Sequence, residues 1–154
     1  MLKKVAKISK NPKDTERLAA SFLEGIVNKG SKKALVVGLS GELGTGKTTF
    51  TQFVAKYLGI KRKASSPTFV IMKKYPIKHG QYKFLFHLDA YRLKNEKELL
   101  HLGWEEIIGN KEHLVFIEWP ENVKKIIPRN SVSIEILHTE NGHRTFKINK
   151  SKML

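Results

Sequence analysis

The most chemically informative segment is a glycine-rich run that separates an apolar stretch from a helical pattern. Gly41-Glu-Leu-Gly-Thr-Gly-Lys47-Thr48 matches the phosphate-loop pattern G-x-x-x-x-G-K-[ST]. Glycines let the backbone turn tightly, so that successive N–H groups converge on phosphate oxygens, and the helix that follows adds the positive end of its dipole. We therefore expect Lys47 to reach the β- and γ-phosphates of a nucleotide and the Thr48 hydroxyl to bind Mg²⁺.

The backbone of this loop and the first turn of the following helix form the predicted nucleotide-binding surface. Positions 42 and 45 carry Glu and Thr, and the pattern requires only that they permit the turn. The residues expected to contact the nucleotide are Glu42, Leu43, Gly44, Thr45, Gly46, Lys47, Thr48 and Thr49.

Two acidic residues are candidates for the second protein anchor that magnesium needs in such a site. Asp89 follows the apolar run 84–88, and Glu118 follows the apolar run 114–117. Both would emerge at the carboxyl ends of parallel strands, the edge where open α/β sheets bind ligands. Either acid could touch the metal directly, and either could orient an attacking water.

Three more residues near these anchors carry polar or aromatic groups. In Ser65-Ser-Pro-Thr-Phe, the proline would stiffen the turn and leave the Thr68 hydroxyl free to approach a γ-phosphate or to hold a water. We expect His87 to face the core or a neighbouring side chain rather than a metal. Trp119, beside Glu118, could pack against the end of the sheet or cover a site, and the sequence favours packing.

The hydrophobic patterning predicts the elements that hold these residues in place. Strands are expected over 4–9, 34–39, 68–72, 82–88, 114–118, 131–137 and 144–148, and helices over 14–30, 47–58, 96–102 and 104–108, with a helical turn from Pro120. Pro76 to Gly80 and Asn141-Gly142 indicate hairpin turns. Buried strands that alternate with helices predict a single α/β domain over 1–154, with a mostly parallel central sheet and antiparallel hairpin additions.

Length and composition exclude several classes of protein. The chain has 154 residues, about one domain, with 40% hydrophobic and 28% charged residues, which excludes wholesale disorder. It contains no Cys, so disulfides, thiol catalysis and Cys-ligated zinc are ruled out. No apolar run approaches the roughly 18 residues of a membrane-spanning helix. We expect a cytoplasmic protein.

The charge of the chain is strongly basic and unevenly distributed. The formal net charge is +15; the segment 61–83 holds seven basic residues and no acid, and the first 13 residues hold five Lys and no acid. Such a field favours association with phosphate-rich or acidic partners. A lysine-rich surface that is merely solvated explains the same composition equally well.

Four motifs in a fixed order together resemble a known family. They are Gly-Glu-Leu-Gly-Thr-Gly-Lys-Thr-Thr-Phe at 41–50, Ser-Pro-Thr-Phe at 66–69, His-Leu-Asp-Ala-Tyr-Arg-Leu at 87–93 and Ile-Glu-Trp-Pro-Glu at 117–121. The sequence resembles the bacterial TsaE (YjeE-type) P-loop ATPases of tRNA threonylcarbamoyladenosine biosynthesis over roughly residues 14–148. The resemblance implies a three-layer P-loop NTPase fold.

The family resemblance also implies a function more specific than the spacing can show. It implies a small ATPase, using ATP and Mg²⁺, that joins the partner proteins TsaB and TsaD, which transfer a threonylcarbamoyl group to adenosine 37 of tRNA. Hydrolysis would reset that complex between turnovers. By position, Glu118 is the implied second metal ligand, Asp89 lies near the metal or the attacking water, and Thr68 belongs to a switch-like segment. Thr15 falls where the family's first helix begins near the nucleotide.

No arginine finger can be assigned from the sequence, although Arg62 and Arg92 are candidates by position. We expect hydrolysis to be slow alone and faster with partners, and tRNA to be met indirectly or through the basic segment 61–83. One alternative is a small-molecule P-loop kinase, which would normally need an Arg-rich lid that the sequence does not show. A second is an RNA-binding module whose affinity ignores ATP and falls steeply with salt.

Overall fold

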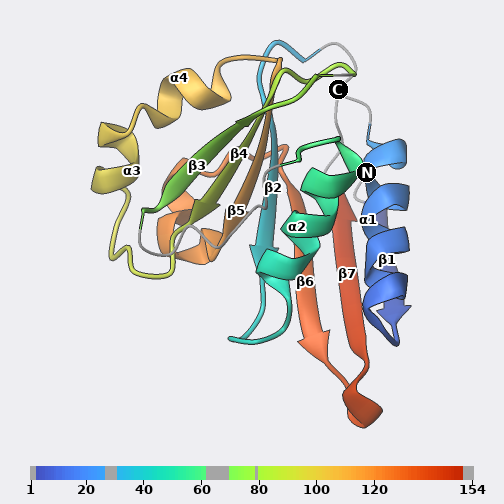
Figure 1. Ribbon diagram of the computed structural model, residues 1–154. Coiled ribbons are helices and arrows are strands. Elements are labelled where there is room, and N and C mark those ends of the chain that lie inside the picture. Colours follow the sequence, from blue (N-terminus) through green and yellow to red (C-terminus); the bar gives the residue numbers. More distant parts are fainter. Residues whose placement is uncertain (1–2, 27–30, 62–69, 79, 151–154) are drawn as a thin grey trace.

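The computed structural model describes residues 3–26, 31–61, 70–78 and 80–150. Its centre is one seven-stranded sheet in the order β1-β7-β6-β2-β5-β4-β3 (Figure 1). The strands are β1 (Lys3–Ser9), β2 (Leu35–Ser40), β3 (Met72–Pro76), β4 (Phe84–Asp89), β5 (His113–Glu118), β6 (Val132–His138) and β7 (Arg144–Lys150). β6, β2, β5 and β4 run parallel, whereas β7, β1 and β3 add antiparallel pairs at the two sides.

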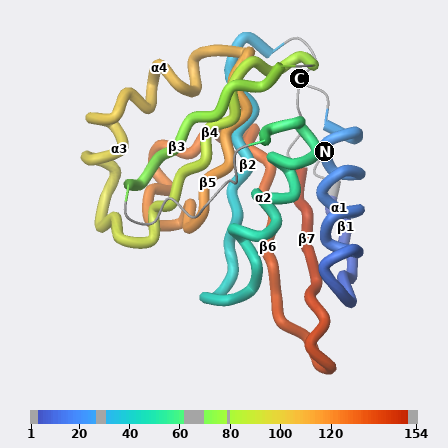
Figure 2. Tube along the Cα trace, in the orientation of Figure 1, coloured from blue at the N-terminus to red at the C-terminus, as the bar shows by residue number. Residues whose placement is uncertain are grey.

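Helices cover both faces of the sheet, which makes three layers (Figures 1 and 2). The helices are α1 (Pro12–Gly25), α2 (Lys47–Tyr57), α3 (Lys97–His101) and α4 (Trp104–Ile108), with 3₁₀ segments η1 (Pro120–Ile126) and η2 (Glu140–Gly142). α1 and α2 pack side by side, and α3 and α4 lie over the β3–β5 side. The predicted fold, a parallel core with antiparallel additions, is confirmed.

Each face of the sheet buries its own hydrophobic core. Under α1 and α2, the rings of Phe22, Phe50, Phe116 and Phe146 contact one another with centroid separations of 5.4–6.4 Å. Under α3, α4 and η1, Trp104 is 1% exposed and donates from Nε1 to the Ile126 carbonyl. Because parallel strands are buried on both faces, their sequences are nearly unbroken apolar runs.

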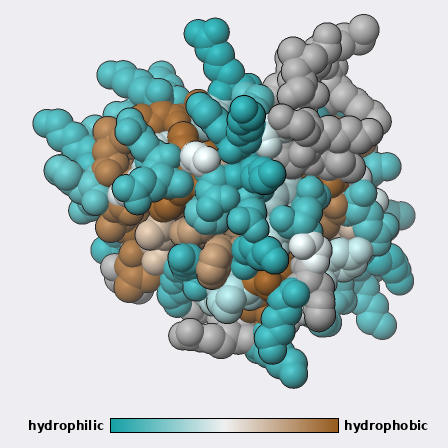
Figure 3. Space-filling model, turned by 90° about the horizontal axis from the view of Figure 1, so that it is seen from above, coloured by the Kyte–Doolittle hydropathy of each residue, from teal (hydrophilic) through white to brown (hydrophobic). Residues whose placement is uncertain are grey.

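Hydrophobic side chains are unevenly distributed over the outer surface. Figure 3 shows that hydrophilic side chains cover most of the face seen from above, with hydrophobic residues gathered on the side where α3 and α4 lie. Leu100 and Leu102 are among the exposed hydrophobic residues there, at 40% and 41%. None of the helices in the described ranges combines the length and apolar character needed to cross a bilayer.

Two predicted boundaries are shifted by several residues. Of the strand expected over 68–72, residues 68–69 lie outside the described residues and Val70 and Ile71 form a turn and a bend, so the strand that the structure shows begins only at Met72 and includes Pro76. Proline is tolerated there because β3 is an edge strand, where its missing N–H removes no ladder hydrogen bond. α1 ends at Gly25, earlier than the predicted end near residue 30, and Ile26 caps it in an extended conformation.

Candidate functional site

The loop between β2 and α2 is held in a conformation that only glycine adopts easily. Gly41, Gly44 and Gly46 have φ values of 141°, 79° and 105°. A Cβ at Gly41 would overlap the carbonyl oxygen of Ile136 in β6, and one at Gly46 would come within 2.7 Å of Arg144 Nη1. The loop therefore packs against the β6–β7 hairpin: position 41 has no room for a side chain beside the β6 backbone, and a side chain at position 46 would require the Arg144 guanidinium to move.

Thr45 has a structural task within the loop. Its side chain is 1% exposed, and its hydroxyl donates to the Glu42 carbonyl at 2.9 Å. Leu43, at the tip of the loop, is 65% exposed. The residue at position 45 therefore does more than permit the turn, because its hydroxyl forms a hydrogen bond across the turn.

Lys47, the first residue of α2, lies at the centre of the loop. Its Nζ donates to the carbonyls of Gly41 at 2.6 Å and Glu42 at 2.8 Å, and lies 4.3 Å from the centroid of the Trp119 ring. Burial lowers the pKa of the Lys47 ammonium, and nearby carboxylates, Glu118 foremost, oppose that shift. The cation therefore sits where a phosphate group entering the loop would meet it.

Glu118 ends β5 and is 3% exposed. The Thr48 hydroxyl donates to this carboxylate, with distances of 3.0 Å to Oε1 and 2.9 Å to Oε2, and His87 Nε2 lies 2.6 Å from Oε2. Glu118 and Thr48, 70 residues apart in sequence, are thus direct neighbours. His87 faces a neighbouring side chain, as predicted.

Asp89 ends β4 and pairs with Glu118 in the sheet register. It is 5% exposed, and its Oδ1 accepts from the backbone N–H of Tyr91 at 2.9 Å. The Tyr91 ring packs on Trp119 with centroids 5.1 Å apart. Trp119 has φ 60° and packs against the core under η1, so the packing predicted for it is present, while its ring also lines the site.

A cavity of about 350 Å³ opens at this edge of the sheet. Its lining includes Lys47, Thr48, Asp89, Glu118, Trp119 and Arg144. A second cavity of about 170 Å³ lies beside it, and Thr49 and Arg144 line both. A larger groove of about 590 Å³ between α1 and β1 contains none of the phosphate-loop residues.

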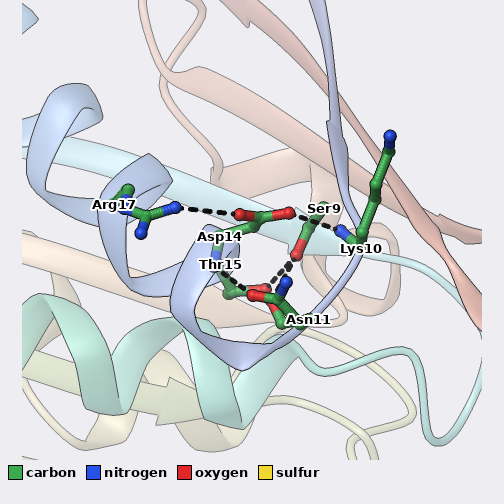
Figure 4. A network of polar contacts seen from close by, with 6 residues as sticks. All are labelled: Ser9, Lys10, Asn11, Asp14, Thr15 and Arg17. Carbon is green, nitrogen blue, oxygen red and sulfur yellow. Dashed lines mark hydrogen bonds and ion pairs between the residues drawn. The ribbon is translucent and has the colours of Figure 1, made fainter.

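Thr15 lines the second cavity. It is 3% exposed, and its hydroxyl lies 2.6 Å from Ser9 Oγ; Figure 4 shows both in the polar network where β1 meets α1. Asn11 caps α1 by accepting from the Asp14 N–H, and Asp14 in turn accepts from the Lys10 N–H. The start of α1, and Thr15 with it, is thus tied to the end of β1.

The oxygen donors at the sheet edge suit magnesium. A hydroxyl and a carboxylate are hard ligands, and Mg²⁺ commonly binds one or two such groups together with phosphate oxygens and water. Among the described residues no group of three or more His, Asp and Glu could hold a metal without a ligand's help. Thr48 and Glu118 could therefore supply two oxygen ligands to Mg²⁺.

The structure does not place every predicted residue at this site. Thr68 and Arg62 lie outside the described residues. Arg92 is exposed and lines neither cavity. In the basic segment 61–83, Lys74 lies over the Phe84 ring at 4.1 Å, on the edge strand β3.

Sequence reasoning missed Arg144. Its position could be found only from the order of the strands: β6 lies parallel to β2, so the hairpin after β6 begins at the same sheet edge as the phosphate loop. Arg144 is the first residue of β7 and therefore returns beside Gly46.

Comparisons with known proteins identify the family and the fold of the chain. The family model described as threonylcarbamoyl adenosine biosynthesis protein TsaE matches residues 9–146. The chain is similar to the tRNA threonylcarbamoyladenosine biosynthesis protein TsaE of Bacillus subtilis, with 34% identity over 87% of this chain and 78% of the relative. It is also similar to that of Haemophilus influenzae, with 32% identity over 78% and 73%. The crystal structure of YdiB from Bacillus subtilis superposes with a TM-score of 0.72 and 27% identity, covering 99% of this chain and 88% of that one.

Proposed function

The chain belongs to the TsaE family of the tRNA threonylcarbamoyladenosine pathway, and on that premise we propose that it binds and hydrolyses ATP in the cavity beside the phosphate loop. One observation carries the proposal. Lys47 and Thr48 from the phosphate loop line the same cavity as Glu118, which comes from a motif 70 residues after Thr48, and a hydrogen bond joins Thr48 to Glu118. That combination is the set of groups a P-loop ATPase uses on its triphosphate and metal.

Each of these side chains has a defined task in the proposal. When the nucleotide binds, the Lys47 ammonium gives up its hydrogen bonds to the loop carbonyls and donates to β- and γ-phosphate oxygens, whose negative charge it offsets. Thr48 and Glu118 hold Mg²⁺, which when bound neutralises the developing charge on the phosphates. Asp89, at the neighbouring strand end, orients the attacking water. Thr68 is proposed to contact the γ-phosphate from its switch-like segment.

The smaller cavity is proposed to take the nucleoside end of ATP. It continues from the phosphate cavity past Thr49 and Arg144 toward Thr15. The Arg144 guanidinium beside Gly46 can bind the phosphates, and the polar start of α1 can contact the ribose or base.

The proposed partners are the TsaB and TsaD proteins, with tRNA reached through them or through the basic segment 61–83. Of the arginines in the described ranges, Arg144 alone lines the phosphate cavity. A partner that supplies further charge would therefore accelerate a slow intrinsic hydrolysis.

Phosphate release tests this function. We expect slow release from ATP by the purified protein and a clear rise when the TsaB–TsaD pair and substrate tRNA are added. Phosphate that appears on a small molecule, with none set free, would replace the proposal with a kinase. A rate indifferent to the partners would leave an ATPase that acts outside this complex.

A further inference from the structure

His87 is a buried side chain with no part in binding the phosphates. It is 0% exposed on β4, where the sheet register places it between Lys73 and Phe116. Its Nε2 lies 2.6 Å from Glu118 Oε2, whereas its Nδ1 has no hydrogen-bond partner within the part of the chain that the structure describes. Among the described residues, the His87 ring therefore has Glu118 as its hydrogen-bond partner.

The chemistry of the pair decides which group donates. An ionised carboxylate only accepts hydrogen bonds, so the hydrogen belongs on His87 Nε2. The opposite tautomer would set a nitrogen lone pair against a carboxylate oxygen and leave a buried N–H without an acceptor, which is costly. His87 therefore presents one fixed donor to one oxygen of Glu118.

Two donors from different elements hold the Glu118 carboxylate. Thr48 donates from the first turn of α2, and His87 donates from the adjacent strand β4. Because Glu118 is 3% exposed, water contributes little to its hydrogen bonding. Thr48 has a second task at the metal in the proposed function, so His87 is the donor devoted to the carboxylate.

We propose that His87 is a positioning residue that fixes the Glu118 carboxylate in the orientation that receives the nucleotide-bound metal. The inference rests on the proposed function and adds to it the residue that sets metal affinity. Removing a hydrogen-bond donor behind a metal ligand typically weakens metal binding about 10–100-fold.

Metal affinity measured without turnover tests the inference. Mn²⁺ replaces Mg²⁺ and is titrated into the protein with ADP, and free Mn²⁺ is followed by electron paramagnetic resonance. His87→Leu removes the donor, whereas His87→Gln keeps an amide N–H at the distance of Nε2. His113→Leu is the control, because His113 is another hydrogen-bonded histidine on the sheet; it is partly buried, its Nδ1 lies 2.8 Å from the Ile107 carbonyl, and it is at the opposite end of β5 from Glu118.

We expect His87→Leu to weaken Mn²⁺ binding at least about 10-fold, and His87→Gln and His113→Leu to stay near wild type. ADP affinity in EDTA should be the same in all four proteins.

Unchanged Mn²⁺ affinity in His87→Leu overturns the inference, as does a Gln variant as weak as the Leu variant, or an equal loss of metal-free ADP binding. If His87→Leu does not fold, His87→Asn, whose amide is too short to reach Glu118, replaces it. Wild-type protein that binds no Mn²⁺–ADP would instead refute the proposed function.

Discussion

The two ends of the proposed nucleotide groove, which joins the cavities of about 350 and 170 Å³, are built in different ways. The phosphate end is made by the parallel strands β2, β4 and β5 and by α2, and its groups are buried and bonded to one another: Lys47 to the loop, Thr48 and His87 to Glu118. The opposite end is made by the start of α1 and by the β6–β7 hairpin, where Asn141 and Gly142 are exposed.

In the proposed function, the phosphate end serves the reaction and the opposite end serves nucleotide binding. Buried, mutually bonded groups keep their positions before the substrate arrives, which is what stabilisation of a phosphoryl-transfer transition state requires. The exposed end contributes contacts that affect binding more than rate. We therefore expect substitutions at the phosphate end to lower kcat and those at the opposite end to raise KM.

Lys47→Ala should give the largest effect, because it removes the buried cation at the phosphates. We expect ATP hydrolysis to fall more than about 100-fold, with little change in the melting temperature, measured by phosphate release and circular dichroism. Lys56→Ala is the control: it lies on the same helix, but it is exposed and paired with Glu16. Undiminished turnover in Lys47→Ala would assign catalysis to another part of the chain.

Gly41→Ala tests the junction between the two ends. Residue 41 has a positive φ, and the added Cβ would overlap the Ile136 carbonyl oxygen. The substitution should therefore lower the free energy of unfolding by about 2–4 kcal/mol. Gly44→Ala, with φ 79° and no atom within 4 Å of the added Cβ, should cost only about 1–2 kcal/mol. Chemical denaturation of both variants measures the difference, and equal losses would mean that the contact with β6 is unimportant.

Arg144→Ala should act mainly on binding. We expect KM for ATP to rise about 10-fold, because one charge-assisted contact is worth roughly 1.5–3 kcal/mol, and kcat to change less. Arg129→Ala, an exposed arginine outside both cavities, serves as the control. If kcat falls while KM is unchanged, Arg144 belongs with the catalytic groups and the division between the two ends fails.

The smallest effect concerns the stability of the nucleotide-free protein at high pH. Burial lowers the pKa of Lys47 in the folded state. Between that pKa and the unfolded value near 10.5, the unfolded chain binds the proton and the folded chain does not, so stability rises with pH. Relative to Lys47→Met, wild type should therefore gain stability as the pH rises through this interval, measured by denaturation. A relative loss would show that the nearby carboxylates outweigh burial.

The phosphate end could be predicted from sequence because its residues follow local rules. A glycine-rich turn, the helix after it and two acids at the ends of apolar runs are each visible in a short window, and the structure places Asp89 and Glu118 side by side at the same sheet edge. Their roles at a metal stay predictions. His87 was expected to meet a neighbour, but the identity of that neighbour depends on the pairing of β4 with β5.

The opposite end could not be predicted from local sequence patterns, because it depends on strand order, and only Thr15 was expected there, from the family resemblance. Nothing within the sequence around Arg144 indicates a site, since a hairpin strand with a basic residue is ordinary. Arg144 reaches the cavities only because β6 pairs with β2. Thr15 reaches the smaller cavity only because β1 pairs with β7. Edge-strand boundaries such as that of β3 were also missed, because an edge tolerates a proline that usually marks a turn.

The pairing of β1 with β7, from Lys3 opposite Lys150 to Ser9 opposite Arg144, joins the first strand of the chain to the last. During synthesis on a ribosome, the loop at 41–48 and its helix emerge long before β7 exists. A nascent chain can thus shape its phosphate loop early, but it cannot close the groove until β7 has been made. Closure of the groove therefore reports that residues 144–150 have been made and have paired with β1.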